Sequence, residues 1–168
     1  KGDFVSIMGP AGARKSTLRY ILGGLDVPSS GSVYMNGTDI SKFDDHKMII
    51  IRRHKIGFVF QFYNLIPNLN VEENVMLPLL LDGKKLKDYR SRLDDILETV
   101  GLAERKKHTP REVSGGQQQR VAIARARIGN PEMLFADEPT GNLDSKTGAE
   151  IMELLHSINK HTGQTIIM

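Results

Sequence analysis

The segment that decides the fold joins a short apolar run to a glycine-rich loop and a helix, and it reads Phe4-Val5-Ser6-Ile7-Met8-Gly9-Pro10-Ala11-Gly12-Ala13-Arg14-Lys15-Ser16-Thr17. The apolar run predicts a central parallel strand. After the loop, apolar residues recur at i, i+3, i+4 and i+7, which predicts one face of a helix: Leu18, Ile21, Leu22 and Leu25. A strand, a glycine-rich loop and a helix in this order are typical of a phosphate-binding loop.

The loop is the candidate nucleotide-binding element. Its consecutive backbone N–H groups and the helix N-terminus are suited to anionic phosphates. We expect Lys15 to reach the β- and γ-phosphates and Ser16 to ligate Mg²⁺. The predicted nucleotide-binding residues are Gly9, Pro10, Ala11, Gly12, Ala13, Arg14, Lys15, Ser16 and Thr17.

One position of the loop departs from the pattern. The pattern has glycine immediately before the lysine, whereas this chain has Arg14. A glycine there lets the backbone approach the phosphates without a side chain in the way. We predict that Arg14 weakens nucleotide binding, and a nucleotide-binding module with impaired hydrolysis is therefore an alternative function.

Two carboxylates end a second apolar run, Met133 to Ala136. We expect Asp137 to hold Mg²⁺, through water, and Glu138 to orient and polarise the attacking water, because positioning and electrostatics dominate phosphoryl transfer. Gln61 ends another buried strand, and the carboxyl ends of parallel strands share one edge. The predicted catalytic residues are Glu138 and Gln61, and the predicted metal ligands are Ser16, Gln61 and Asp137.

The other patterns predict an α/β fold with a mainly parallel sheet. Asn36-Gly37 lies between short β-forming runs and predicts a hairpin, which indicates a partial antiparallel β-lobe near residues 30–60. Residues 71–128 have mostly helical patterns, and we predict an inserted helical lobe over about 65–125. One helix of this region begins at Ser114, because Ser114 and Gln117 have the spacing of a capping box. A strand from Thr165 ends the chain.

Composition bounds these expectations. The 168 residues suffice for a single domain, residues 1–168, and the net charge of +3 is too small to indicate nucleic acid. The absence of cysteine excludes disulfides and thiolate metal sites. No apolar run approaches the roughly 18 residues of a bilayer span, so we expect any membrane role to go through a partner. Core strands near both ends lead us to expect a fragment truncated at both ends.

Three motifs together carry a family resemblance. Ser114-Gly115-Gly116-Gln117 comes about twenty residues before the Asp-Glu strand. The segments Phe135–Ser145 and Ile56–Gln61 complete the set. In these motifs the chain resembles the ATPase subunits of ATP-binding-cassette (ABC) transporters, which have the fold of phosphate-loop NTPases. It is most similar to the branch that serves lipoprotein release, macrolide and antimicrobial-peptide export, and cell division.

The resemblance implies ATP binding and hydrolysis that energise a membrane permease for export or extraction of a lipophilic or peptide substrate. It implies ATP and Mg²⁺ as cofactors, a homodimer or a paired ATPase subunit, and a peripheral location on the cytoplasmic face of the cell membrane. Asp144 would lie at the dimer interface, and the segment from Gln61 to about Leu80 would meet the permease. The residues that would contact ATP held by the other subunit are Ser114, Gly115, Gly116 and Gln117.

Some family features are changed or lie elsewhere. Arg19 and Arg127 stand where the family usually has apolar residues. The family's adenine-stacking aromatic residue would precede Lys1, and its switch histidine would follow Met168. Nucleic-acid or ribosome-acting ABC ATPases share the motifs and are a second alternative. Those proteins carry long insertions, and the compact stretch from Gln61 to Ser114 shows none, so we expect no nucleic-acid partner.

Overall fold

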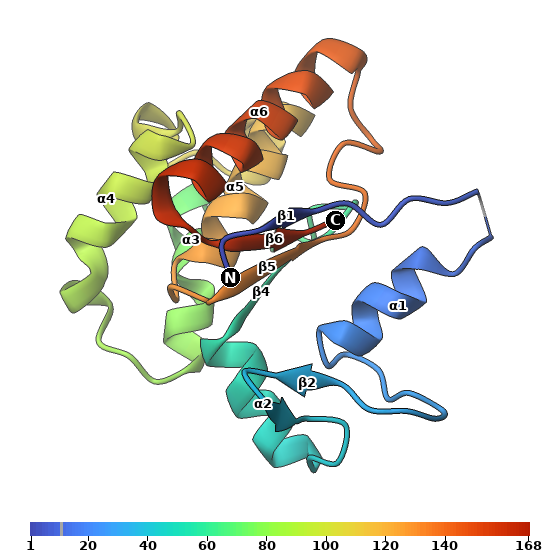
Figure 1. The fold of residues 1–168 in the computed structure, drawn as a ribbon. Helices are drawn as coiled ribbons and strands as arrows, with labels where there is room; N and C mark the ends of the chain where they lie inside the picture. Colours follow the sequence, from blue (N-terminus) through green and yellow to red (C-terminus); the bar gives the residue numbers. More distant parts are fainter. Residues whose placement is uncertain (11) are drawn as a thin grey trace.

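The computed structural model describes residues 1–10 and 12–168 and shows an α/β fold (Figure 1). The strands are β1 (Phe4–Val5), β2 (Tyr34–Met35), β3 (Thr38–Asp39), β4 (Ile56–Val59), β5 (Met133–Ala136) and β6 (Thr165–Ile167). The α-helices are α1 (Lys15–Leu22), α2 (Asp45–His54), α3 (Val71–Leu81), α4 (Arg90–Thr99), α5 (Gly115–Arg127) and α6 (Ser145–Thr162). Short 3₁₀ helices are η1 (Leu86–Tyr89), η2 (Ala103–Arg105) and η3 (Pro110–Glu112).

The main sheet is parallel, with the strand order β1-β6-β5-β4 in the described residues. The buried strands β4 and β5 pair in register, with Val59 opposite Ala136. The residues that follow β4 and β5 therefore leave the sheet at the same edge. The predicted mainly parallel sheet is confirmed, but the prediction that the first strand is central is wrong. Among the described residues β1 pairs only with β6 and lies at the edge of the sheet, where Val5 is exposed.

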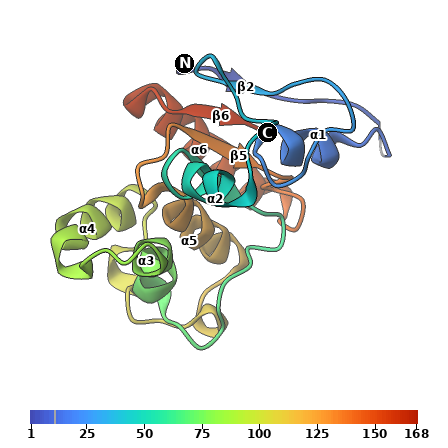
Figure 2. The same cartoon turned by 90° about the horizontal axis from the view of Figure 1, so that it is seen from below.

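Helices cover both faces of the sheet (Figures 1 and 2). Helices α5 and α6 lie over one face, and α1 and α2 lie on the other. The main core combines the inward residues of β4, β5 and β6 with those of α3, α4, α5 and α6, and Leu134, Ile123 and Ile166 in it are fully buried. This packing fixes the positions of the strand ends, and with them the polar residues that follow β4 and β5.

The antiparallel lobe is smaller than predicted. The strands β2 and β3 pair around Asn36 and Gly37, which both have positive φ angles (50° and 78°), so the predicted hairpin turn is confirmed. The prediction for residues 30–60 did not include α2, whose first turn is capped by the Asp44 side chain accepting from Lys47 N. Met48 of α2 packs with Met35 of β2 in a second buried cluster that also contains Ile56 and Phe135, so the lobe packs against the main sheet.

Helices α3 and α4 stand to one side of the sheet, away from α1 (Figures 1 and 2). Helix α5 links them to the sheet, because it packs against both α3 and β4. The predicted capping box at its start is confirmed, since Ser114 Oγ accepts from Gln117 N and Gln117 Oε1 accepts from Ser114 N. No helix among residues 1–10 and 12–168 has the length and apolarity of a membrane span.

Candidate functional site

The phosphate loop connects β1 to α1, and its lysine bends back over it. Lys15 Nζ donates to the carbonyl oxygens of Gly9 (2.9 Å) and Pro10 (3.0 Å). Gly12 has a φ of 82°, a conformation that glycine adopts without strain. Predicted residue Ala11 lies outside the described residues. The lysine ammonium therefore rests against the backbone of the loop that the sequence assigns to phosphate.

Arg14 has the backbone conformation that the pattern reserves for glycine. Its φ and ψ are 54° and 34°, which is left-handed, and its side chain makes no capping hydrogen bond to α1. A left-handed conformation costs a non-glycine residue roughly 1–2 kcal/mol. The left-handed backbone at Arg14 thus agrees with the prediction that a residue other than glycine is unfavourable at this position.

One face of α1 meets the end of β5 at Asp137. Ser16 Oγ donates to Asp137 Oδ1 (3.1 Å), and Tyr20 Oη donates to Asp137 Oδ2 (2.9 Å). The hydrogen bond to Asp137 and partial burial raise the pKa of Tyr20 above its usual value. Ser16 and Asp137, which the sequence predicts to share a site, are thus in contact.

The same face contributes an arginine that sequence reasoning did not assign to the site. Arg19 forms an ion pair with Asp137 Oδ1 and donates through Nη2 to Ser16 Oγ (3.1 Å). A signal for this was present, since Arg19 follows Ser16 by three residues and such residues are neighbours on a helix. From the sequence, Arg19 stands out only as a charged residue where the family usually has an apolar one.

Gln61 and Glu138 lie near this edge on the loops that follow β4 and β5. The Gln61 backbone carbonyl accepts from Asn142 Nδ2 (2.9 Å), and a Cβ placed on Gly141 would come within 2.7 Å of Gln61 Nε2. Glu138 is exposed and has a φ of 45°. In the described residues no hydrogen bond joins the Gln61 side chain to Ser16 or Asp137. The structure therefore brings Gln61 to the adjacent loop, not into the Ser16–Asp137 contact.

The oxygen atoms at this edge suit Mg²⁺ by type. Ser16 Oγ and Asp137 Oδ1 are hard oxygen ligands, and Mg²⁺ usually takes one or two protein ligands and completes its shell with water and phosphate. Within residues 1–10 and 12–168 there is no cluster of three or more His, Cys, Asp or Glu that could hold a metal alone. The residues fit Mg²⁺ that arrives with a nucleotide, except that Arg19 also contacts both oxygens.

The Ser-Gly-Gly-Gln segment forms the N-terminus of α5. Ser114 is exposed there, while Gly116 is buried against α6. A Cβ on Gly116 would come within 2.4 Å of Thr147 Cγ2, so the close approach of α5 and α6 requires glycine. Gly115 faces Tyr63, whose hydroxyl would be 3.2 Å from a Cβ placed there. Ser114 is thus the member of the segment best placed to face a second molecule.

A buried glutamine connects this helix to the loop that carries Glu138. Gln119 is fully buried, and its Nε2 donates to the Pro139 carbonyl (2.7 Å). Gln119 stands third in a run of three glutamines and is not among the residues predicted from the sequence to form the site. Its contact gives α5 a direct mechanical link to the residue after Glu138.

Asp144 is the N-cap of α6. Its carboxylate accepts from Lys146 N (3.1 Å), Thr147 N (3.0 Å) and Thr147 Oγ1 (2.6 Å). The hydrogen bonds from Thr147 hold the pKa of Asp144 below its usual value. The residue is exposed, so this capping role leaves it available at the surface.

Comparison with known proteins identifies a family. The family model described as ABC transporter matches residues 1–141. The lipoprotein-releasing system ATP-binding protein LolD of Geobacter metallireducens is 47% identical over 168 residues, which are all of this chain and 75% of that protein. The macrolide export ATP-binding/permease protein MacB of Bdellovibrio bacteriovorus is 50% identical over the same length, which is only 25% of that longer protein.

A solved structure shows the same fold. It is a dimeric post-hydrolysis state of the ATP-binding cassette MJ0796 bound to ADP and Pi, a protein of Methanocaldococcus jannaschii. The TM-score is 0.86 at 48% sequence identity, and the match covers 99% of this chain and 73% of that one. The predicted resemblance is confirmed.

Proposed function

The chain belongs to the ABC transporter family as an ATP-binding ATPase domain, and on this premise we propose that it works in a dimer that sandwiches ATP and drives a membrane permease. The proposed task is export or extraction of a lipophilic or peptide substrate, as in the relatives named for lipoprotein release and macrolide export. The domain would act at the cytoplasmic face of the membrane, held there by the permease.

The observation that carries the proposal is the meeting of α1 and β5 at Asp137. Lys15 leaves its contacts with the Gly9 and Pro10 carbonyls to bind the phosphates. Ser16 and Asp137 would hold Mg²⁺, which neutralises charge on the phosphates when bound. Glu138, exposed on a constrained backbone, orients the attacking water, and Gln61 assists from the neighbouring loop. Ser114 and the residues after it contact ATP held by the other subunit, beside Asp144.

The test is ATP hydrolysis by the full-length protein with Mg²⁺. Lys15→Ala removes the ammonium that binds phosphate and leaves the core untouched, since Lys15 is only half-buried and its Nζ contacts the Gly9 and Pro10 carbonyls at the surface. We expect this variant to lose both ATP binding and phosphate release while unfolding at the parent temperature. Equal activity of the two proteins would overturn the proposed site.

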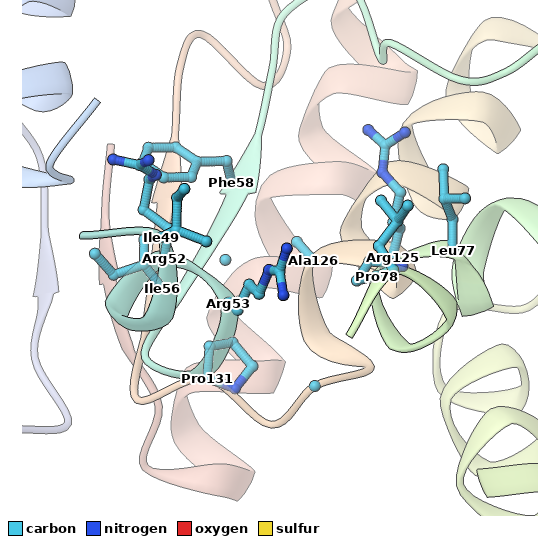
Figure 3. A pocket seen from close by; sticks show the side chains of 13 residues that line it. Ile49, Arg52, Arg53, Ile56, Phe58, Leu77, Pro78, Arg125, Ala126 and Pro131 are labelled. Atoms are coloured by element: carbon cyan, nitrogen blue, oxygen red, sulfur yellow. The ribbon is translucent and has the colours of Figure 1, made fainter. Parts of the chain in front are cut away.

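A cavity of about 470 Å³ between α2, β4, α3 and α5 is the proposed permease-docking surface (Figure 3). Its apolar lining includes Ile49, Phe58 and Leu77, and arginines stand among these residues. Arg52 and Arg125 donate to backbone carbonyls and form no ion pair in the described residues. We therefore propose an amphipathic permease helix with an apolar face and a carboxylate as the occupant.

The sequence prediction named only part of this surface. Leu77, Pro78 and Leu81 belong to the segment from Gln61 to about Leu80 or adjoin it, but the opposite wall comes from α2 and α5. Val71 lies in the same segment but is buried in the main core.

Two neighbouring leucines allow a matched test of docking. Leu81 lines the cavity and is 66% exposed, whereas Leu80 is 56% exposed and lines a separate hollow. We expect Leu81→Asp to abolish co-purification of the full-length ATPase with its permease, and Leu80→Asp to retain it. Loss of co-purification in both variants, or in neither, would contradict docking at this cavity.

A second candidate function is a nucleotide-binding module that hydrolyses ATP slowly. The left-handed Arg14 and the Arg19–Asp137 ion pair favour it, because both alter the loop that must hold the phosphates and the metal. Single-turnover measurement of ATP hydrolysis separates it from the main proposal: this candidate predicts bound ATP that persists unhydrolysed through many minutes.

A further inference from the structure

Asp137 is held by an arginine whose charge is shielded from water. The Arg19 side chain is 4% exposed and the Asp137 side chain 17%. Buried ion pairs are strongly destabilised when one partner is lost, because the other charge is left without compensation. The other contacts of the Arg19 guanidinium are weaker: Nη2 also donates to Ser16 Oγ (3.1 Å), and Nη1 reaches the Ala136 carbonyl only at 3.4 Å. Its Nε is buried without a partner in the described part of the chain. Asp137 is therefore the main anchor of this guanidinium.

The guanidinium contacts the same oxygen atoms that are expected to bind the metal. Arg19 Nη2 contacts Asp137 Oδ1 and Ser16 Oγ, which are the two oxygens suited to Mg²⁺. The other carboxylate oxygen of Asp137 accepts from the Tyr20 hydroxyl (2.9 Å). Arginine remains charged at any pH that proteins tolerate, so it cannot make room by losing a proton. A divalent cation bound to Ser16 and Asp137 would be repelled by the permanent positive charge of Arg19.

We infer that Arg19 determines the metal requirement of this site: its guanidinium replaces much of the charge that Mg²⁺ supplies, so ATP binding depends only weakly on Mg²⁺. The inference rests on the proposed nucleotide binding and adds a residue that sets its cofactor dependence. Helix α1 provides the geometry, because Ser16, Arg19 and Tyr20 lie at i, i+3 and i+4 on one face.

The test compares the ATP affinity of the full-length protein with Mg²⁺ and with excess EDTA, by calorimetry. Arg19→Leu restores an apolar residue and frees Asp137. The matched control is Arg127→Leu, which makes the same exchange at a half-buried arginine whose side chain contacts Gln164. In the parent and the control we expect the two dissociation constants to agree within about threefold. In Arg19→Leu, Mg²⁺ should tighten ATP binding by at least about tenfold.

This readout separates metal selection from a purely structural role. A structural ion pair would change stability but leave the ratio of the two dissociation constants unchanged. A parent protein that already prefers Mg-ATP by about tenfold, with the same preference in Arg19→Leu, overturns the inference.

A second measurement needs no nucleotide. Urea unfolding of Arg19→Leu, Asp137→Asn and the double variant forms a double-mutant cycle. We expect Asp137→Asn to be strongly destabilised, because Arg19 is left buried and unpaired, and the double variant to regain most of the loss. Additive losses would show that Asp137 does not hold Arg19, and would overturn the inference on that ground. If no variant binds ATP under either condition, both the proposed nucleotide binding and the inference about Arg19 fail. If the proteins bind ATP but Arg19→Leu leaves the Mg²⁺ preference unchanged, only the inference about Arg19 fails.

Discussion

Two non-glycine residues of the site are held in the left-handed region, Arg14 at φ 54° and Glu138 at φ 45°. Such conformations cost of order 1–3 kcal/mol each and persist where the surrounding structure determines them. Around Glu138 the determinants are visible, because Gly141 N donates to the Glu138 carbonyl (3.0 Å) and closes a turn. The Arg14 carbonyl likewise accepts from Leu18 N (3.1 Å), but the Arg14 side chain makes no capping hydrogen bond to α1, so glycine can replace it and relieve the strain.

Arg14→Gly should tighten ATP binding at least about tenfold, which is some 1.4 kcal/mol. Glycine removes the side chain beside the phosphates, and it adopts the left-handed angle without strain. Calorimetric titration of ATP into both full-length proteins measures the change. Arg14→Ala is the control, because it removes the guanidinium but keeps the strain. Equal affinity of the parent and Arg14→Gly, or weaker binding with glycine, would show that the loop tolerates or uses the arginine.

The residue pattern placed Ser16 and Asp137 in one site, which agrees with their contact, and it missed the positive charge of Arg19 beside them. Lys15, Ser16, Asp137 and Glu138 follow strands or open a helix, and such positions can be read from spacing alone. The Arg19–Asp137 pair could not be predicted with the same ease, since it depends on how α1 rotates against β5. The available signal was a charged residue, Arg19, at a position expected to be apolar. Only the packing of α1 shows that its partner is the Asp137 carboxylate.

At the scale of elements, segments with a strong local signal were predicted well, whereas one helix with an ambiguous pattern was missed. The capping box of α5 and the turn at Asn36-Gly37 are local signals that fix backbone geometry by themselves. Helix α2 was missed, because its residues Ile49, Ile50 and Ile51 form a consecutive apolar run with β-branched side chains. Its Asp44 N-cap and its packing through Met48 decide in favour of helix.

The contact of α5 with α6 gives a prediction at this scale. Gly116→Ala would place a methyl group 2.4 Å from Thr147 Cγ2, so the helices must shift and the free energy of unfolding should fall by about 1–3 kcal/mol. Urea unfolding measures it. Adding Thr147→Ala removes the colliding methyl group, so Gly116→Ala should cost less in a Thr147→Ala background. An unchanged cost there would mean that the collision is not the cause.

At the scale of the whole molecule, the proposed site would need a second chain to complete it. Ser114 is exposed at the start of α5, on a helix that the Gln119–Pro139 contact joins to the Glu138 loop. The phosphate loop opens α1, on the opposite face of the sheet (Figures 1 and 2). A second subunit that presents its Ser114 to the phosphate loop of the first would complete the site, in keeping with the dimeric ATP-binding cassette of similar fold.

Two inactive variants should complement one another. In a mixed dimer of Ser114→Arg with Lys15→Ala subunits, one composite site lacks both elements and the other is intact. We therefore expect ATPase activity to reappear on mixing the two full-length variants. The control mixes Ser114→Arg with a subunit that carries both substitutions, which leaves no intact site. Absence of recovery at every mixing ratio would argue against sites shared between subunits.

The central claim, an ATP-sandwich dimer, is tested most directly by sedimentation of full-length Glu138→Gln with saturating ATP. The substitution removes the carboxylate that polarises water but keeps the phosphate loop, so bound ATP should hold two subunits together. We predict a dimer with ATP and a monomer without it, and a monomer in both conditions when Lys15→Ala is added. A Glu138→Gln protein that binds ATP and remains monomeric would contradict the account.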